Sequence, residues 1–412
     1  MKNQGIQGTE SEPPEKTGEG KTVAVSDPKP DDPFVKSLSG QALHAIRVVI
    51  AGGGTGGHLF PGIAIAEAFM AKNPQNQVLF VSTGNPFEIS VLSKTNFDLA
   101  PITAEGIKGR GLRNQVRSML KIPRGIFESI GILGRFKPDV VMGVGGYASG
   151  PLAVAAWLMR IKIVLHEQNI LPGITNRILA NIADRIYVSF ENTKAAFHPA
   201  KVIVTGNPVR KEILKSVRDQ KAADRGNGAN RRPFTLLILG GSQGAHRINT
   251  AMVEALEYIK DMDRFFFVHQ TGLKDETMVK QVYQSKGVSC EVKPFFIDMA
   301  DQYRKADLVV GRAGATTVAE LTATGKAVIF VPYPFAADNH QVLNARTLTE
   351  AGAAEMILQK DLTGRILSER IENYASHPEA LERLASKAKS LGKPNAAAAI
   401  VEDCYRLAMG NG

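Results

Sequence analysis

Cysteine is nearly absent from this sequence of 412 residues, in which only Cys290 and Cys404 occur. Two cysteines cannot build a disulfide framework or a cysteine metal site. Proteins without disulfide bonds are typical of a reducing compartment, so we expect a cytoplasmic protein.

A long apolar segment of the membrane-spanning kind is also lacking. Residues Val140 to Met159 carry no charge, but several glycines and a proline interrupt them, and a spanning helix tolerates such breaks poorly. We predict a strand over Val140–Val144, a tight loop over Gly145–Gly150 and a helix over Leu152–Arg160. The segment Met1–Lys21 has no apolar stretch of the kind found in a secretory signal.

Basic residues, in contrast, are plentiful. The net charge of +10 favours an anionic partner, which can be nucleic acid, an acidic membrane surface or a phosphorylated ligand. We find no RNA- or DNA-binding motif and therefore expect no nucleic acid. One basic cluster interleaves with apolar residues at helical spacing, which describes either an ordinary helix with a solvated basic face or a peripheral helix on anionic lipid. The basic residues are Lys108, Arg110, Arg113, Arg117, Lys121, Arg124, Arg135 and Lys137, and the apolar ones are Ile122, Ile126, Phe127, Ile130 and Leu133.

Two series of short β-rich apolar segments alternate with helical patterns. This alternation predicts an α/β fold with two doubly wound parallel sheets. The strands expected in the first series are Ile46–Ala51, Val78–Val81, Val140–Val144, Ile161–His166, Arg185–Val188 and Val202–Thr205. Those expected in the second series are Phe234–Leu239, Phe265–His269, Val288–Val292, Leu308–Val310 and Ala327–Val331.

The two series set the expected domain boundaries. Residues 1–44 are rich in Pro, Glu, Lys, Gly and Asp, and we expect them to form a disordered tail. A first domain covers 45–210, a charged linker or insertion covers 211–232, and a second domain covers 233–394. Ligands are expected at the carboxyl ends of the strands.

A glycine-rich loop follows the first strand of each domain, over Gly52–His58 and Gly240–His246. The first loop contains the G-x-G-x-x-G pattern of dinucleotide-binding folds. Such folds need an acid at the end of the second strand, about 20 residues on, and here none follows that strand before Glu88. The second loop contains the G-x-S-x-G pattern of serine hydrolases around Ser242, with His340 downstream. Because the two loops echo each other, contact with a phosphate or a nucleotide explains both more economically.

A third small-residue segment, Gly311–Glu320, follows a strand and opens a helix. Its backbone N–H groups and the positive end of the helix dipole suit a diphosphate leaving group. The spacing Thr317-x-x-Glu320 has an alternative interpretation as a capping box of that helix.

Taken together and in this order, the motifs resemble the MurG family of bacterial glycosyltransferases. That family adds N-acetylglucosamine to the undecaprenyl-diphosphate-linked muramyl peptide of peptidoglycan synthesis. The resemblance covers essentially Ile46 to the C-terminus. The matching segments are Gly53–His58 with Phe60-Pro61-Gly62, Gly145–Pro151, His166–Asn169, Gly206–Arg210, Gly241–Gly244, Arg312–Glu320 and Asp338–Ala345.

The resemblance implies a GT-B fold, in which two Rossmann-like domains face a cleft and a last helix, within 395–412, crosses back to the first domain. It implies inverting transfer from UDP-N-acetylglucosamine to the C4 hydroxyl of undecaprenyl-diphosphate-linked N-acetylmuramyl-pentapeptide. The enzyme would be peripheral, at the cytoplasmic face of the plasma membrane, and would use no metal and no cofactor. In agreement, no Asp-x-Asp pair is placed to hold a divalent cation on a diphosphate.

Site residues follow from the same resemblance. His58 is the candidate base for the attacking hydroxyl, since imidazole exchanges protons near neutral pH; its alternative role is to bind phosphate or cap the helix. Tyr147 and Glu167 are secondary candidates, and Glu320 would accept the ribose hydroxyls. The donor site would comprise Thr55, Gly56, Gly57, Asn169, Arg210, Ser242, Ile297, Arg312, Ala315, Thr316, Thr317, Glu320 and Gln341. The acceptor site would comprise Gly56, Gly146, Tyr147, Ser149 and Glu167.

Three other functions stay open at this point. A glycolipid-forming transferase acting on diacylglycerol and a sugar-nucleotide epimerase would both use this architecture. A non-catalytic subunit that binds a UDP-sugar is the third, although the joint presence of His58, Arg210 and Glu320 argues against it.

Overall fold

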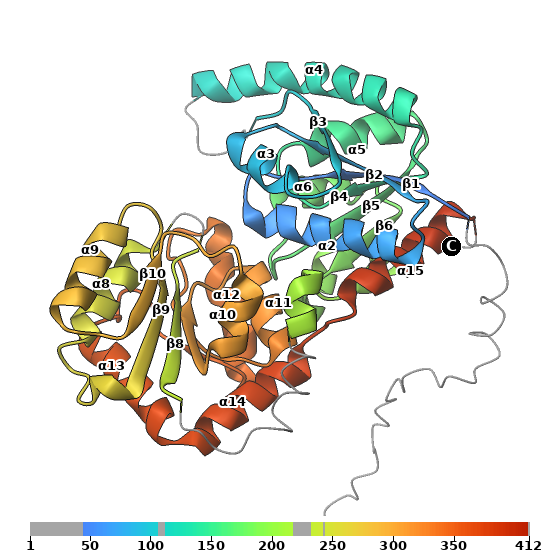
Figure 1. The fold of residues 1–412 in the computed structure, drawn as a ribbon. Coiled ribbons are helices and arrows are strands. Elements are labelled where there is room, and N and C mark those ends of the chain that lie inside the picture. The colour runs from blue at the N-terminus through green and yellow to red at the C-terminus, as the bar shows by residue number, and fades with distance from the viewer. Residues whose placement is uncertain (1–43, 106–111, 217–231, 242–243, 411–412) are drawn as a thin grey trace, which may run out of the picture. The chain divides into compact units, whose positions relative to one another are not determined.

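The computed structural model describes residues 44–105, 112–216, 232–241 and 244–410, and for 112–121 the backbone only. Nearly all of the expected tail, most of the expected linker and Ser242 therefore lie outside the described residues. The same holds for Lys108 and Arg110 and for the side chains of Arg113, Arg117 and Lys121. The described residues form two parallel sheets with helices on both faces (Figure 1), which confirms the predicted α/β fold with two doubly wound domains.

All neighbouring strands of the first sheet are parallel, in the order β3-β2-β1-β4-β5-β6-β7. The chain starts in the middle of the sheet and builds outward in both directions, so the loops after β1 and β4 lie side by side at the carboxyl edge. The strands are β1 (Arg47–Ala51), β2 (Gln77–Ser82), β3 (Asp98–Pro101), β4 (Val140–Gly143), β5 (Lys162–Glu167), β6 (Arg185–Val188) and β7 (Val202–Val204).

Both faces of this sheet are covered because successive side chains of a strand point to opposite faces and here both sets are apolar. Val48 and Ile50 pack in one cluster with α2 (Gly56–Lys72) and α15 (Ala396–Ala408). Val49 packs in a second cluster on the other face. The helices of that face are α4 (Leu112–Phe136), α5 (Ser149–Leu158) and α6 (Ile174–Leu179), and α3 (Pro86–Leu92) follows β2.

The second sheet has the order β10-β9-β8-β11-β12-β13, again with all neighbours parallel. Its strands are β8 (Phe234–Leu239), β9 (Phe265–Gln270), β10 (Cys290–Lys293), β11 (Leu308–Gly311), β12 (Ala327–Phe330) and β13 (Glu355–Met356). One face carries α8 (His246–Ala255), α9 (Glu276–Ser285) and α13 (Gly364–Ser376), and the other carries α10 (Met299–Lys305), α11 (Ala315–Thr324) and α12 (His340–Glu350).

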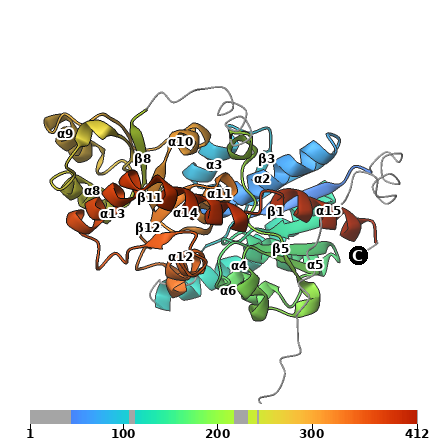
Figure 2. The same cartoon turned by 90° about the horizontal axis from the view of Figure 1, so that it is seen from below.

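The last two helices pack on different sheets. In Figure 2 the red helices α14 (Pro378–Leu391) and α15 follow one another, and α14 packs on α11 whereas α15 packs on α2. Two buried tyrosines anchor α15 to the first sheet's layer. Tyr187 donates a hydrogen bond to Asp403 at 3.0 Å, and the Tyr405 hydroxyl lies 2.7 Å from Asn76 Oδ1.

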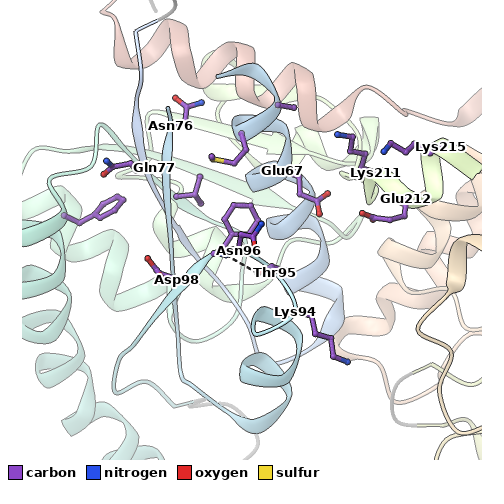
Figure 3. A pocket seen from close by; sticks show the side chains of 15 residues that line it. Glu67, Asn76, Gln77, Lys94, Thr95, Asn96, Asp98, Lys211, Glu212 and Lys215 are labelled. Atoms are coloured by element: carbon purple, nitrogen blue, oxygen red, sulfur yellow. Dashed lines mark hydrogen bonds between the residues drawn. The ribbon is translucent and has the colours of Figure 1, made fainter. Parts of the chain in front are cut away.

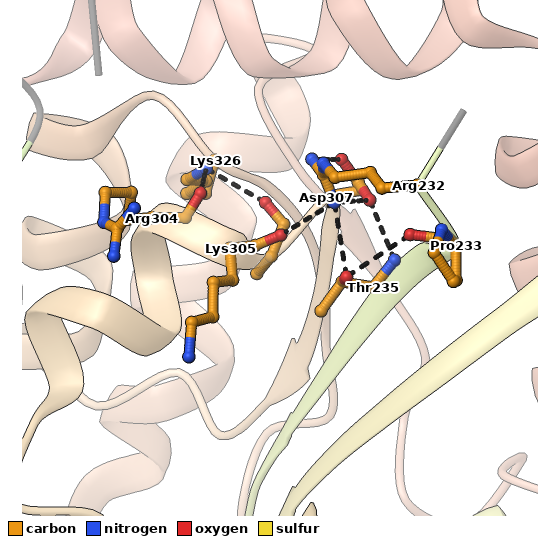
Figure 4. A network of polar contacts seen from close by, with 8 residues as sticks. Arg232, Pro233, Thr235, Arg304, Lys305, Asp307 and Lys326 are labelled. Atoms are coloured by element: carbon orange, nitrogen blue, oxygen red, sulfur yellow. Dashed lines mark hydrogen bonds and ion pairs between the residues drawn. The ribbon is translucent and has the colours of Figure 1, made fainter. Parts of the chain in front are cut away.

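An aspartate precedes a strand at three places and closes the amino edge of a sheet. The carboxylates of Asp139, Asp184 and Asp307 accept from the backbone N–H of Arg47, Ile163 and Thr235 at 2.7, 2.8 and 2.8 Å, each at the start of the neighbouring strand. Asp307 also forms a two-pronged ion pair with Arg232, whose Nη1 and Nη2 lie 2.8 and 2.6 Å from its oxygens (Figure 4). These carboxylates satisfy backbone donors that a strand start would otherwise leave to water.

The described fold differs from the sequence prediction mainly at the sheet edges. The strands β3 and β13 were not predicted, and the helix expected from Leu152 begins at Ser149 instead. Short 3-10 helices occupy Glu191–Ala196, Pro199–Lys201, Met262–Arg264 and Ala337–Asn339. Among the described residues, no helix is both long and apolar enough to cross a membrane.

Candidate active site

Glu88, a fully buried carboxylate at the start of α3, holds the first glycine loop in place. Its Oε1 accepts from Gly54 N–H, and its Oε2 accepts from the hydroxyls of Ser82 and Thr83 at 2.9 and 3.1 Å. A Cβ on Gly53 would collide with this carboxylate. Glu88, whose position in the sequence does not fit the ribose-binding acid of a dinucleotide fold, therefore supports the glycine loop.

His58 lies in the first turn of α2, and its ring reaches the end of β5. Nδ1 lies 2.9 Å from Oε1 of Gln168, a buried side chain. The ring also passes close to Gly145, where a Cβ would stand 2.7 Å from Nδ1. Gly145 has φ +94°, so both its space and its backbone conformation favour glycine.

The loop after β4 packs against the first glycine loop backbone to backbone. A Cβ on Gly146 would meet the carbonyl oxygen of Gly53 at 2.7 Å. Next to it, Tyr147 is 55% exposed at the carboxyl edge. Ser149 is buried, and its hydroxyl lies 2.9 Å from the carbonyl oxygens of Ala51 and Gly145. The structure therefore brings Gly146 and Tyr147 to the surface of the edge and turns the Ser149 side chain inward.

Glu167 is also buried, and its carboxylate folds the loop that follows β5. It accepts from the N–H groups of Asn169 and Gly173, both at 3.0 Å, and from Asn176 Nδ2 at 2.8 Å. Asn169 meets the second domain, since its Oδ1 lies 3.4 Å from the amide nitrogen of Asn344. Through these three contacts Glu167 anchors the loop that follows β5.

Glu320 and Arg210 form a buried ion pair that joins α11 to the segment after β7. Arg210 Nη2 lies 2.9 Å from Glu320 Oε1, and the hydroxyl of buried Tyr303 donates to Oε2 at 2.9 Å. Burial opposes the charge on Arg210, but the Glu320 carboxylate outweighs it and raises the pKa of Arg210. The guanidinium also stacks 4.4 Å from the ring centre of Phe60 on α2.

The capping-box interpretation of Thr317 and Glu320 is wrong. The N-cap of α11 is Gly314, the helix begins at Ala315, and Glu320 lies in the second turn of the helix with its carboxylate on Arg210 and Tyr303. The Glu320 side chain therefore does not cap the amino end of the helix.

The amino ends of α2 and α11 meet at this point. The Thr316 hydroxyl donates to the carbonyl oxygen of Gly57 at 3.2 Å, and Thr55, the N-cap of α2, makes no side-chain capping bond. Backbone N–H groups at a helix start carry partial positive charge. The predicted donor residues Thr55, Gly56, Gly57, Ala315, Thr316 and Thr317 therefore lie together on two neighbouring helix starts.

Arg312 and Gln341 both hold the loop after β12. Arg312 donates to the carbonyl oxygens of Val331 and Pro332 at 2.9 and 3.1 Å and to Gln359 Oε1 at 2.7 Å. Burial lowers its pKa to about 10. Gln341 Oε1 accepts from the backbone N–H of Tyr333 at 3.0 Å. Ile297 lies apart from these residues, in the exposed loop after β10, and is 74% exposed.

The segment before α12 has an unusual backbone conformation. Asp338 and Asn339 have φ values of +51° and +56°, in the left-handed region that non-glycine residues seldom occupy, although Asp and Asn do so more readily than the others. Such residues cluster at functional sites. This pair precedes His340 and Gln341 at the carboxyl edge of the second sheet.

Two cavities flank the first sheet. One of about 420 Å³ is lined by Thr83, Thr103 and Glu128 at the carboxyl ends of β2 and β3, near the glycine loop. Another, of about 790 Å³, lies at the opposite, amino edge, where Glu67 and Lys211 line it (Figure 3). Burial, with Glu212 nearby, raises the pKa of Glu67. Since ligands of this fold bind at carboxyl edges, we do not assign the larger cavity to the reaction.

Several residues of the site are not apparent from sequence motifs alone. Tyr303 contacts the predicted site residue Glu320, and Glu88 contacts Gly54 of the first glycine loop, through side chains that become neighbours only in the folded chain. Asn344 and Gln168 lie within the matched segments Asp338–Ala345 and His166–Asn169, and that was the available signal. Among the described residues no group of His, Cys, Asp and Glu is arranged to hold a metal ion.

Both domains match known domain families. Residues 48–188 match the glycosyltransferase family 28 N-terminal domain, and residues 235–400 match the glycosyltransferase family 28 C-terminal domain. A protein of Syntrophus aciditrophicus named UDP-N-acetylglucosamine–N-acetylmuramyl-(pentapeptide) pyrophosphoryl-undecaprenol N-acetylglucosamine transferase is 46% identical over 369 residues, which are 88% of this chain and 99% of that protein. A protein of the same name from Geobacter sulfurreducens is 46% identical over 359 residues, 87% of this chain and 98% of the relative.

Solved structures agree with these matches. MurG of Acinetobacter baumannii superposes with a TM-score of 0.68 at 31% identity, over 87% of this chain and 98% of that one. UDP-N-acetylglucosamine 2-epimerase of Neisseria meningitidis, bound to UDP-N-acetylglucosamine, superposes with a TM-score of 0.61 at 17% identity, over 87% and 99%. At that identity the epimerase shares the fold alone. The matches confirm the expected GT-B fold.

Proposed function

We infer the reaction from one premise: the chain belongs to the MurG family of UDP-N-acetylglucosamine–N-acetylmuramyl-(pentapeptide) pyrophosphoryl-undecaprenol N-acetylglucosamine transferases. The enzyme transfers N-acetylglucosamine from its UDP carrier to the C4 hydroxyl of the lipid-linked muramyl-pentapeptide, with inversion. The bond between the sugar C1 and the UDP oxygen breaks as the C4 oxygen bonds to C1. The hydroxyl proton goes to a base, and UDP leaves with the bonding electrons.

The departing diphosphate is stabilised by the two helix starts. Gly56 and Ala315 begin α2 and α11, which touch through Thr316 and Gly57. Helix starts bind phosphates through free N–H groups and the helix dipole, and such donors stabilise charge that develops in the transition state. No metal ion is needed for this role in the scheme. Ser242 is proposed as a further diphosphate contact on the resemblance alone.

Glu320 binds the ribose of the donor. Its carboxylate has about four lone-pair positions, and the contacts with Arg210 and Tyr303 use one on each oxygen. Lone pairs therefore remain for ribose hydroxyls. Ile297 contributes backbone contacts to uracil and Gln341 contacts to the sugar. Arg312 and Asn169 support this pocket by holding the loops that border it.

His58 is the base, with Tyr147 beside it on the acceptor side. Gly146 and Gly56 offer backbone N–H groups to the acceptor diphosphate, whereas Ser149 and Glu167 hold the loops in shape. The support for this arrangement is that His58 and the loop of Gly145 and Gly146 pack against each other at one sheet edge.

The acceptor's lipid places the first domain on a membrane. On the face covered by α4 and α5, Phe127 and Trp157 are 74% and 54% exposed, and Leu158 is exposed as well. The exposed basic residues Arg124 and Arg160 belong to the same two helices or their ends. Apolar side chains beside basic ones are typical of an interfacial surface on anionic lipid. We therefore propose peripheral attachment at the cytoplasmic face of the plasma membrane.

A flotation assay tests the attachment. Wild-type protein should float with anionic vesicles and much less with zwitterionic ones, and Phe127→Gln with Trp157→Gln should abolish flotation. Tyr258→Gln, an exposed aromatic of the second domain, serves as the control. Equal flotation of all three proteins would contradict the proposed surface.

The reaction is tested by transfer of labelled N-acetylglucosamine to a short-chain lipid-diphosphate muramyl-pentapeptide with a chelator present. Wild-type protein should form product, and His58→Ala should lose about 100-fold or more of the rate because the base is gone. Glu320→Ala should also lose activity, because it removes the contact with the donor's ribose. Transfer to diacylglycerol instead would indicate the glycolipid-forming alternative. Donor binding without transfer to either acceptor would indicate a binding subunit.

A further inference from the structure

The orientation of the Gln168 side-chain amide is determined by its surroundings. Its Nε2 lies 2.8 Å from the carbonyl oxygen of Val144, 2.9 Å from Nδ1 of His166 and 3.3 Å from the carbonyl oxygen of His166. These groups are acceptors, so the NH2 group must face them. Rotating the amide by half a turn would bring its oxygen against two carbonyl oxygens in a buried site. The oxygen Oε1 therefore faces His58.

His166 agrees with this orientation. It is fully buried, and burial, partly offset by its contact with the Gly206 carbonyl, lowers its pKa to about 4. The ring is thus neutral near pH 7. Its Nε2 lies 3.3 Å from the carbonyl oxygen of Gly206 and so carries the proton, which leaves Nδ1 free to accept from Gln168. Every group around the Gln168 NH2 is therefore an acceptor, and two of the three lie within 2.9 Å.

The hydrogen bond between Gln168 and His58 determines the tautomer of His58. An amide oxygen only accepts hydrogen bonds, so Nδ1 of His58, 2.9 Å away, must be the protonated nitrogen. In the neutral ring the other nitrogen, Nε2, then carries the free lone pair. Which ring nitrogen is protonated is generally decided by such a partner.

We propose that Gln168 is a positioning residue, which keeps His58 protonated on Nδ1 so that Nε2 receives the proton of the attacking C4 hydroxyl. The idea rests on the proposed function, in which His58 is the base. On proton transfer Nε2 gains one proton and Nδ1 keeps its own, so the imidazolium donates to Oε1 as before. The amide keeps the ring in place without taking a proton. A carbonyl acceptor thereby fills the place that a carboxylate occupies in serine hydrolases.

The tautomer is measured directly on the full chain by long-range proton–nitrogen NMR of protein labelled with 15N in histidine. The His58 signals are those that disappear in His58→Ala. The wild-type spectrum should show the Nδ1-protonated pattern, and Gln168→Met should move His58 to the Nε2-protonated pattern or to a mixture. An Nε2-protonated wild-type His58 would overturn the proposal.

Kinetics separate positioning from general damage to the fold. In Gln168→Met, kcat should fall about 10- to 100-fold with little change in KM for UDP-N-acetylglucosamine. In a His58→Ala background the same substitution should cost almost nothing more, because the base that it positions is gone. Equal losses in both backgrounds would overturn the positioning role.

The two hypotheses can fail separately. A His58→Ala protein with wild-type activity would reject His58 as the base, whatever its tautomer. An unchanged kcat in Gln168→Met, together with a large loss in His58→Ala, would keep the base and reject the role of Gln168.

Discussion

The Glu88 carboxylate is buried, and its hydrogen bonds go to neighbouring groups of the protein. It accepts from the Gly54 N–H, from two hydroxyls and from the Asn85 N–H. Glu88→Gln should therefore lower the free energy of unfolding by about 1–3 kcal/mol, because an amide NH2 would face these donors. Urea unfolding measures the change, and transfer activity should fall as the glycine loop loosens. Glu382→Gln on the exposed side of α14 is the matched control, and equal stabilities would contradict the role.

Arg210 balances the buried charge of Glu320. Their side chains are only 19% and 6% exposed, so Arg210→Ala leaves a buried carboxylate without its cation. We expect a loss of about 3 kcal/mol in the free energy of unfolding. Arg365→Ala, which breaks an exposed pair with Glu369 one helical turn away, should cost at most about 0.5 kcal/mol. Equal losses in the two variants would contradict a charge-balancing role of Arg210.

Sequence motifs suffice to propose candidate site residues, but they do not give the orientations of those side chains. Sequence motifs brought forward His58, Arg210 and Glu320, and the fold places them at the edges expected of parallel sheets. Motifs could not tell that Ser149 and Glu167 turn into their own loops, since that depends on hydrogen bonds formed only after the chain has folded.

At the level of secondary structure, three aspartates carry the same role in two domains. Asp307 accepts from Thr235 N–H and pairs with Arg232 at the amino edge of the second sheet. Asp307→Ala should lower the free energy of unfolding by about 1–2 kcal/mol, whereas Asp307→Asn, which keeps an acceptor oxygen, should lose less. Asp301→Ala, which loses an exposed pair with Arg304, is the control. Equal stability of the alanine and asparagine variants at position 307 would contradict the role of the acceptor oxygen.

The interior strands could be predicted because they are buried on both faces. A run such as Leu308–Gly311 is apolar throughout, which is typical of a central parallel strand. The edge strands β3 and β13 escaped because their sequences DLAP and EM contain no β-branched residue, in contrast to the short edge strand VIV of β7. Their pairing with β2 and β12 depends on the sheet rather than on their own sequence.

For the whole molecule, buried histidines predict sensitivity to mild acid. Burial lowers the pKa of His166 to about 4 and of His269 to about 3, from 6.5. Below pH 6.5 the unfolded chain binds protons at these positions and the folded chain does not, so stability falls as the pH drops toward 4. The slope is at most about 1.4 kcal/mol per pH unit for each histidine.

Urea unfolding between pH 7 and pH 5 measures this slope, above the range where most carboxylates titrate. His269→Gln should flatten it, and His198→Gln, an exposed position, should leave it unchanged. A free energy of unfolding that does not vary over this range would contradict the neutral buried histidines.

The proposed reaction is tested most directly by the identity of the product made from UDP-N-acetylglucosamine and a lipid-diphosphate muramyl-pentapeptide. One sugar should be added per UDP released, joined through the muramyl C4 oxygen with inverted configuration at C1, in the presence of a chelator. A retained configuration, a different linkage position or UDP release without the acceptor would contradict the proposed reaction.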